Sequence, residues 1–523
     1  MKNLKKFVAL ALSAVMATST MAACGGSSDD SDTGTLTFGC QNYGGGGIDP
    51  ATEINQAWNV VRYGIGECLF KFNDSVEVEN WLCDSYTVSD DHKTWVFHIR
   101  DGVKFSDGCD LTAQAVVDNF NRLFEAGANG TSKPGSFLEE TAQMTADNAA
   151  GTVTIVTQTA YPDLTKNLAY PVMAILDVAD TTDYTNGAIG TGPYAVSSFT
   201  EEVGYDLVAN ENYWDGTVPY EKVKLLYMED ASAKAYALQN GQVDLVENIT
   251  NVSDLDTLKA DSNYTVTVAP GVRCGFAYIN QARTLGNADL RKAVLMAIDG
   301  QTMCDVTVGG LYTYGYSVLP SNLSYNYDSL TNPYAYNKDA ATQLLDQAGI
   351  TDTDGNGIRE LNGQDITLEF ITYDNRCLSD FAAAVQQQLK EIGINVNVNT
   401  MDSEQEWNTM VNGDYDLCSS NWTTVGTGDP FEYLDNWYGK SEANYCNYQN
   451  DEYDTLYEQL KVELDNAKRT EIITRLQQIL IDDAAVMVHG YYNSSMLANS
   501  KVTGANIHTV DYYWLTTEIK PAS

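Results

Sequence analysis

The chain has 523 residues and is strongly acidic, with 71 Asp and Glu residues against 30 Lys and Arg residues and a formal net charge of −41. Hydrophobic residues make up 44% and aromatic residues 11%, which is a globular composition and excludes a wholly disordered chain. Nucleic acids and anionic membrane surfaces are themselves negative, so the charge excludes both as direct partners. The length suits two or three domains.

The N-terminus has the layout of a secretory signal. A basic start with Lys2, Lys5 and Lys6 precedes an apolar run over residues 7–16, and small residues follow up to Cys24. A Cys directly after small residues resembles the lipobox of bacterial lipoproteins, although Met21 stands where Leu is commoner. The alternative is an ordinary signal peptide with a cysteine nearby.

We therefore expect a signal peptide over residues 1–23, lipid on Cys24 and a flexible tether over residues 24–33. Residues 1–23 hold three lysines and no acidic residue, so their removal would change the net charge from −41 to −44. No internal stretch is long and apolar enough to span a bilayer, so membrane attachment depends on this lipid.

The rest of the chain alternates between strand and helix patterns. Apolar residues at every second position predict strands around residues 95–99, 153–156, 223–227 and 394–398. Apolar stripes at helical spacing predict helices over residues 112–123, 231–239, 290–298, 381–392, 456–464 and 472–479. Many short units of both kinds indicate lobes of α/β or α+β architecture.

Cysteine and histidine residues do not form a recognisable metal motif. Nine cysteines besides Cys24 are scattered without a CxxC pair, and four histidines show no HExxH spacing. We interpret the cysteines as buried free thiols, since the spacing disfavours zinc and iron–sulfur sites.

Several sequence motifs occur together in the order found in one family. Residues 81–124 read WLCDSYTVSDDHKTWVFHIRDGVKFSDGCDLTAQAVVDNFNRLF, residues 190–194 read GTGPY and residues 230–244 read DASAKAYALQNGQVD. DLRKAVLMAID follows at residues 289–299, and GDP at residues 428–430. With these motifs the chain resembles the family 5 solute-binding proteins of ABC transporters, which include oligopeptide-, dipeptide- and nickel-binding proteins.

This resemblance implies an α/β fold of the periplasmic-binding-protein-like type II class, with two lobes, a hinge and an extra inserted domain. By analogy, lobe I takes residues 34–55, 187–279 and 488–523, the inserted domain residues 56–186, and lobe II residues 280–487. The implied function is binding without catalysis. The protein would be an extracytoplasmic monomer, lipid-anchored to the outer face of the bacterial cytoplasmic membrane, that closes on a small ligand and delivers it to a permease.

The resemblance also suggests which residues contact the ligand: Trp58, Arg62, Tyr63, Lys133, Trp422, Asp429, His489 and Tyr491. Four of them have structural alternatives: a salt bridge for Arg62, core packing for Trp422, helix capping for Asp429 and a purely structural role for His489.

The nature of the ligand stays open between a short peptide and a nickel or other metal chelate. Peptide-binding members carry an Asp that pairs with the ligand's α-amino group, and Val425 and Gly426 stand at the matching positions here. Because this carboxylate is missing, we treat a metal chelate and a short peptide as equally supported ligands.

Two further hypotheses come from acidic residues. Asp352, Asp354, Asn356 and Glu360 match part of a calcium loop, but Gly363 replaces its last ligand, so an Asx-rich turn is the alternative to a structural calcium site. An exported acidic hydrolase such as a glycosidase remains the alternative function, although no pair of carboxylates stands out.

Overall fold

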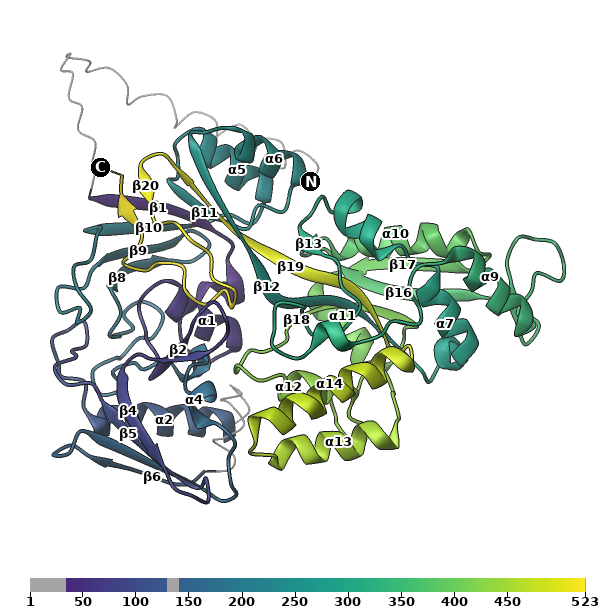
Figure 1. Ribbon diagram of the computed structural model, residues 1–523. Coiled ribbons are helices and arrows are strands. Elements are labelled where there is room, and N and C mark those ends of the chain that lie inside the picture. Colours follow the sequence, from purple (N-terminus) through teal and green to yellow (C-terminus); the bar gives the residue numbers. More distant parts are fainter. Residues whose placement is uncertain (1–33, 129–140, 523) are drawn as a thin grey trace, which may run out of the picture. The chain divides into compact units, whose positions relative to one another are not determined.

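The computed structural model describes residues 34–128 and 141–522, and one mixed sheet of 11 strands runs through it (Figure 1). In spatial order its strands are β17 (Asn395–Met401), β16 (Thr367–Tyr373), β18 (Leu417–Thr423), β12 (Tyr264–Ile279), β19 (Val486–Asn499), β11 (Leu245–Glu247), β1 (Thr35–Cys40), β10 (Lys222–Tyr227), β9 (Gly204–Ala209) and β8 (Tyr194–Thr200), with β13 (Tyr312–Thr313) paired to β19.

The two longest strands, β12 and β19, join the halves of this sheet. They pair antiparallel from Tyr264 opposite Asn499 to Tyr278 opposite Val486. β12 also pairs with β18, and β19 also pairs with β11. Figure 1 shows both strands running diagonally between the two groups of elements. The sheet on one side is therefore continuous with the sheet on the other through this single pair of strands.

A separate four-stranded sheet lies within residues 83–157. Its order is β4 (Cys83–Val88), β5 (Thr94–Ile99), β7 (Thr152–Thr157) and β6 (Thr141–Asp147), and helix α2 (Ala113–Ala128) packs against β6 and β7. Trp95, Phe97 and Ile99 of β5 are buried alternately, which confirms the predicted strand. Thr112 accepts a hydrogen bond from the amide of Ala115 (3.1 Å) and caps α2.

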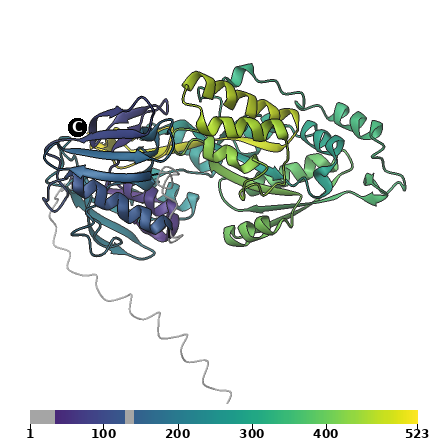
Figure 2. The same ribbon diagram turned by 90° about the horizontal axis from the view of Figure 1, so that it is seen from below.

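Most helices occur among residues 231–482. They are α5 (Ala231–Gln239), α6 (Val252–Ala260), α7 (Ala288–Met296), α8 (Gly300–Thr302), α9 (Lys338–Gln347), α10 (Leu378–Lys390), α11 (Ser403–Asn412), α12 (Phe431–Leu434), α13 (Asp451–Val462) and α14 (Asn466–Asp482). Helix α10 ends before Gly393, whose φ of 79° is left-handed, and β17 follows, as predicted. The two late helices are also confirmed, and α13 lies beside α14 in both views (Figures 1 and 2).

The remaining elements are short. Helices α1 (Ile54–Arg62) and α4 (Leu164–Asn167) and the 3₁₀ turn η1 (Tyr43–Gly46) belong to the N-terminal half. Strand pairs are formed by β2 (Phe70–Phe72) with β3 (Val78–Asn80), β14 (Glu360–Leu361) with β15 (Gln364–Asp365), and β20 (Val502–Thr503) with β21 (Lys520–Pro521).

The hydrophobic core forms three clusters that combine distant parts of the chain. The first unites residues 36–225 with residues 496–519, so both ends of the described chain pack into one core. The other two consist mainly of residues 235–497. The mixed α/β class is confirmed, whereas the domain boundaries stay a prediction.

Two expectations of the sequence analysis concern the described residues: that the cysteines are buried free thiols and that no segment spans a membrane. Nine free thiols occur there, seven of them buried, with Cys109 exposed and Cys377 half-buried. None of the helices within residues 34–128 and 141–522 is both long and apolar enough to cross a bilayer.

Glu67 is a buried carboxyl group that links three segments of the N-terminal half. It is 1% exposed, and its Oε2 accepts hydrogen bonds from the Thr191 hydroxyl (2.8 Å) and the Trp214 indole (2.9 Å), while Tyr213 donates to Oε1 (3.3 Å). Among the described residues no Lys or Arg forms an ion pair with it. Burial raises the pKa of Glu67 to about 7, because the charged form is poorly solvated there.

We predict that Glu67→Gln removes a pH dependence of stability. Between pH 4.5 and 7 the unfolded chain ionises Glu67 while the folded chain keeps it protonated, so wild-type stability falls as pH rises through this window. The variant should gain up to about 3 kcal/mol relative to wild type between pH 4 and pH 8. Urea unfolding at both pH values measures this, with the exposed Glu221→Gln as the control. An equal stability difference at the two pH values would contradict the prediction.

Candidate functional site

Arg62, at the end of α1, lies among three aromatic rings. Its guanidinium carbon is 4.3 Å from the ring centroid of Trp514, 5.2 Å from that of Tyr43 and 5.3 Å from that of Trp58. The side chain is 1% exposed and forms an ion pair of 2.9 Å with Asp511, whose carbonyl also accepts from Nε (2.9 Å). The structure therefore includes the salt bridge that the sequence analysis named as the alternative for Arg62.

Two further arginines approach the same rings, one from the joining strand β12 and one from the second half of the molecule. The guanidinium carbon of Arg273 on β12 lies 5.6 Å from the Trp58 centroid, and that of Arg376, after β16, lies 5.9 Å from the Tyr43 centroid. Because Arg62 shares one ring with each, neither guanidinium carbon is more than about 11 Å from that of Arg62. We call the three arginines, together with the rings of Tyr43, Trp58 and Trp514, the arginine site.

A bulge in β12 places Arg273 at this site. Pro270 is opposite Asn493 and Cys274 is opposite Tyr491, so three residues of β12, Arg273 included, face the single residue Tyr492 of β19. A bulge turns a side chain out of the regular alternation of a strand. Tyr492 in turn lies under Arg376, whose guanidinium carbon is 5.6 Å from its ring centroid.

Neither Arg273 nor Arg376 is neutralised by an acidic residue. Arg273 donates from Nη1 to the carbonyl and Oδ1 of Asn421 (both 3.2 Å), and Arg376 donates to Oδ1 of Asn375 (3.1 Å). In residues 34–128 and 141–522 no carboxylate lies within 4.0 Å of either guanidinium group. Burial, and then the charge of Arg376, lower the pKa of Arg273 to about 10.

Asn421 and Tyr312 hold the two arginines together. Asn421 accepts from Arg273 and donates through Nδ2 to the Tyr312 hydroxyl (2.9 Å), which donates to the carbonyl of Arg376 (2.8 Å). Arg376 and Cys377 have φ values of 46° and 59°, a left-handed conformation that is strained for residues with a Cβ. The hydrogen bond from Tyr312 ties this strained turn to the side chain that orients Arg273.

Further aromatic rings pack in a row beside Trp58. Its ring centroid is 6.0 Å from that of Tyr512, which is 5.9 Å from that of Tyr170. The Tyr512 hydroxyl donates to the carbonyl of Gly426 (3.2 Å), and Val425 is fully buried. Val425 and Gly426, which the sequence analysis matched to the expected Asp, therefore present apolar and backbone groups here.

The other aromatic residues that were predicted to contact the ligand are Trp422, Tyr63 and Tyr491. Trp422 on β18 is half-buried, is opposite Cys274 and donates to the Ser420 hydroxyl (2.9 Å), so it lies one residue from the strand partner of Arg273. Tyr63 is buried against the ring of Tyr205, with centroids 5.9 Å apart. Tyr491 is buried and donates to the carbonyl of Ser317 (2.8 Å).

His489 is fully buried and stacks on Phe381, with ring centroids 4.8 Å apart. Neither ring nitrogen has a hydrogen-bond partner in the described structure, and burial lowers the pKa of His489 to about 3. The ring is therefore neutral and packs within the core. Lys133 and Cys24, the two other predicted residues, lie outside the described residues.

Asp429 has partners of its own. One carboxylate oxygen accepts from the amide of Phe431 (3.0 Å) at the start of α12, and the other pairs with Arg469 (2.7 Å) and more distantly with Lys166 (4.0 Å). It lines a cavity of about 530 Å³ together with residues of β2, β3 and α14. Asp429 thus bonds the first helical amide as a cap would, although Pro430 and not Asp429 occupies the N-cap position of α12.

The candidate calcium loop forms a turn that its own carboxylates organise. Asp352 accepts from the amides of Gly355 (2.7 Å) and Gly357 (2.9 Å), and Asp354 accepts from the amide of Asn356 (3.0 Å). Carboxylate oxygens of Asp352, Asp354 and Glu360 still lie within 4.8 Å of one another on an exposed surface. Calcium binding stays a prediction.

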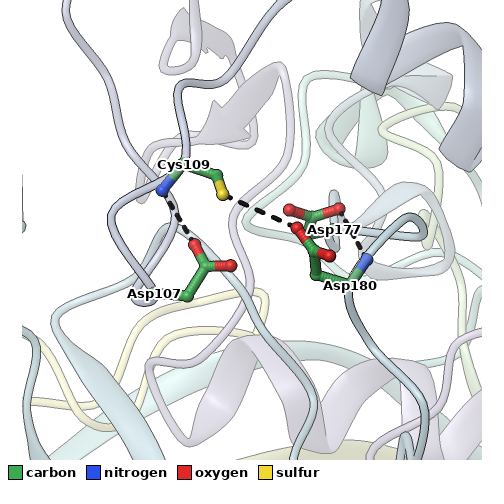
Figure 3. Close-up of side chains that lie close together, drawn as sticks. All are labelled: Asp107, Cys109, Asp177 and Asp180. Carbon is green, nitrogen blue, oxygen red and sulfur yellow. Dashed lines mark hydrogen bonds between the residues drawn. The ribbon is translucent and has the colours of Figure 1, made fainter.

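A second acidic group, next to a thiol, is shown in Figure 3. Cys109 lies 3.6 Å from a carboxylate oxygen of Asp180, and Asp107 accepts from the amide of Cys109 (2.9 Å). Asp177 accepts from the amides of Ala179 and Asp180. A hydrogen bond with Asp107 is the first cause that raises the pKa of the Cys109 thiol to about 11, so without a nearby cation the thiol is protonated at neutral pH.

Sequence reasoning found Trp58 and Arg62 but missed the other members of the arginine site. Tyr43, Arg273, Arg376 and Trp514 are far apart in the sequence and belong to no motif. The one available signal was Arg273 itself, a cation inside a run of strand residues in a chain with only 30 Lys and Arg residues.

Comparison with known proteins identifies the family. The sequence model described as bacterial extracellular solute-binding proteins, family 5 Middle, matches residues 77–445. The probable D,D-dipeptide-binding periplasmic protein DdpA of Escherichia coli K12 is 25% identical over 478 residues, which cover 87% of this chain and 88% of the relative. The nickel-binding protein NikA of Staphylococcus aureus is 26% identical over 460 residues, which cover 86% and 89%.

Solved structures show the same fold. NikA from Staphylococcus aureus in complex with Ni(L-His)2 has a TM-score of 0.77 at 23% identity, covering 93% of this chain and 99% of the other. The oligopeptide-binding protein AppA from Bacillus subtilis in complex with a nonapeptide also has a TM-score of 0.77, at 22% identity and coverages of 94% and 99%. The two-lobed, periplasmic-binding-protein-like fold is therefore confirmed. Since the family model covers most of the chain, this protein belongs to family 5 of the bacterial extracellular solute-binding proteins.

Proposed function

We propose that this protein is the monomeric substrate-binding lipoprotein of an ABC importer, which captures a short peptide or a nickel or other metal chelate and delivers it to the membrane permease. The observation that carries the proposal is the arginine site. Its groups come from η1, α1 and the C-terminal segment on one side, from the β16–α10 connection on the other, and from β12, which joins the two. A ligand that contacts both sides favours the closed state over the open one, which is how binding drives closure.

Family membership removes the alternative of an exported hydrolase. The proteins of this family bind solutes for transport and are not enzymes. Three cations and a wall of aromatic rings also differ from the pair of carboxylates that glycoside hydrolysis requires.

Both ligand types remain in the proposal. Relatives named for dipeptide or oligopeptide binding support the peptide, and relatives named for nickel binding support the chelate. Val425 and Gly426 offer no carboxylate to a peptide's α-amino group, so the peptide has no advantage at this point of the structure.

We predict that a transported solute raises the melting temperature of this protein. At 100 times its dissociation constant a ligand stabilises the folded state by about 2.7 kcal/mol, because it binds only that state. Thermal unfolding with di- and tripeptide mixtures, with nickel–histidine chelates and with a glycoside as control measures the effect. If peptides and chelates leave the melting temperature unchanged while the glycoside is hydrolysed, the importer proposal is wrong.

We also predict that Cys24 carries the membrane anchor. In bacterial cells that express the whole chain, the wild type should sediment with membranes and incorporate labelled palmitate. Cys24→Ala should lose the label and move to the soluble extracytoplasmic fraction, since a single residue holds the acyl chains. The exposed Cys109→Ala is the matched control and should stay with the membranes. Equal labelling of wild type and Cys24→Ala would contradict the lipoprotein proposal.

A further inference from the structure

The charges of the arginine site indicate which ligands it accepts. We propose that the ligand is a small polyanion with at least two carboxylates, bound through the guanidinium groups of Arg273 and Arg376 against the rings of Tyr43 and Trp58. This inference rests on the proposed binding function and narrows the ligand class within it.

The first step is the charge balance of the site. Arg62 is neutralised by Asp511 at 2.9 Å, which leaves two positive charges, on Arg273 and Arg376. The nearby buried carboxylate Glu247 does not neutralise them, because it forms its own ion pair of 2.8 Å with Lys234. Asp374 and Asp380 line a cavity together with Arg376, yet neither forms an ion pair with it.

Two arginines without a carboxylate partner lie in this one site, and of the other described arginines only Arg100 and Arg291 lack one, each bonding backbone carbonyls instead. With 71 acidic residues against 30 basic ones, a carboxylate partner was available almost everywhere, and Arg62, Arg122, Arg359 and Arg469 each have one. Desolvating two like charges close together destabilises the protein unless an opposite charge arrives. A ligand with two negative charges supplies that opposite charge and leaves the site neutral.

The second step is the supply of hydrogen-bond donors. A guanidinium group carries five N–H donors in a planar fork that fits a carboxylate bidentately. In the described structure Arg273 uses only Nη1, on Asn421, and Arg376 uses only Nη1, on Asn375. Each arginine therefore retains enough donors for one bidentate carboxylate.

The third step is the rigidity of the two groups. Asn421 fixes the Arg273 side chain, and through Tyr312 it is connected to the carbonyl of the left-handed residue Arg376. The rings of Trp58 and Tyr43 lie 5.6 and 5.9 Å from the two guanidinium carbons and restrict them further. Donors held in place before binding lose less entropy when the ligand arrives.

The fourth step is the lack, among the described residues, of a free acid beside Trp58 that could pair with an amine. Asp511 binds Arg62 and also accepts from the Trp514 indole (2.7 Å), and Val425 and Gly426 offer no carboxylate. A neutral or cationic peptide would bring a positive amine toward two unpaired arginines. The site therefore selects against such peptides, whereas an anionic metal chelate and an acidic peptide both fit it.

Titration calorimetry on the whole protein in detergent tests the inference with matched probes. The peptide probes are Glu-Glu, Gln-Gln and Lys-Lys, and the chelate probes are citrate alone and Ni²⁺-citrate. We expect at least one anionic probe to bind 10-fold or more tightly than Gln-Gln and Lys-Lys. Binding of Glu-Glu without metal would identify an acidic peptide as the source, and binding of Ni²⁺-citrate over free citrate would identify a chelate.

Variants connect this preference to the two arginines. Arg273→Gln and Arg376→Gln should each weaken the best anionic probe about 10- to 100-fold, as expected for loss of a charged hydrogen-bond donor. The loss should be smaller for an analogue of that probe in which an amide replaces one carboxylate. The analogue lacks a carboxylate that the arginine binds, so removing the arginine removes less binding energy. The exposed Arg475→Gln should leave the affinity unchanged, and Arg376→Lys should recover part of it if Arg376→Gln folds poorly.

The outcomes separate this inference from the proposed function. If Gln-Gln or Lys-Lys binds as tightly as every anionic probe, or if the arginine variants weaken a probe and its amide analogue equally, the polyanion inference is wrong and the importer function stands. If no peptide and no chelate binds, both are wrong.

Discussion

The antiparallel pairing of β12 with β19 is the constraint on which the rest of the structure depends. At its centre Gly275 lies opposite Gly490, and a Cβ on Gly275 would come within 2.8 Å of the Tyr312 ring. The absent side chain lets Tyr312 lie across the strands, where its hydroxyl reaches both Asn421 and Arg376. A few residues away the bulge turns Arg273 toward Trp58. The pairing that joins the two halves thus also builds the site between them.

The net charge of the chain and the charge of its candidate site have opposite signs. The field of a protein with a charge of −41 repels anions at long range and slows their approach. Salt screens that repulsion over about 10 Å, whereas interactions within a half-buried site are screened far less. Affinity for an anion must therefore come from short-range contacts with Arg273 and Arg376, and a slow approach must be offset by slow release.

Features of the structure that depend on neighbouring residues could be predicted from the sequence, whereas features that bring distant residues together could not. The cap at Thr112, the alternation in β5 and the left-handed stop at Gly393 depend on neighbouring residues, so the sequence was enough to place them. The arginine site brings together side chains separated by up to hundreds of residues, and no local pattern encodes that. On β19, alternate residues face opposite sides, so Tyr492 lies near Arg376 while Tyr491 faces Ser317. The resemblance names Tyr491 and is silent on Tyr492, and the ligand contact of Tyr491 stays a prediction.

The carboxylates around the site shape its selectivity as much as the arginines do. Asp511 and Glu247 near the site, and Asp429 at a separate cavity, are each bound to a cation of the protein, at 2.9, 2.8 and 2.7 Å. To bind an amine, any of them would have to leave its partner, and that partner would remain as an unpaired buried charge. Discrimination therefore has two sources: the attraction of an anion to the free arginines and the repulsion of a cation by the same arginines. A ligand without an exposed amine satisfies both conditions, which is why the chemistry of this site follows from the partners its acids already have.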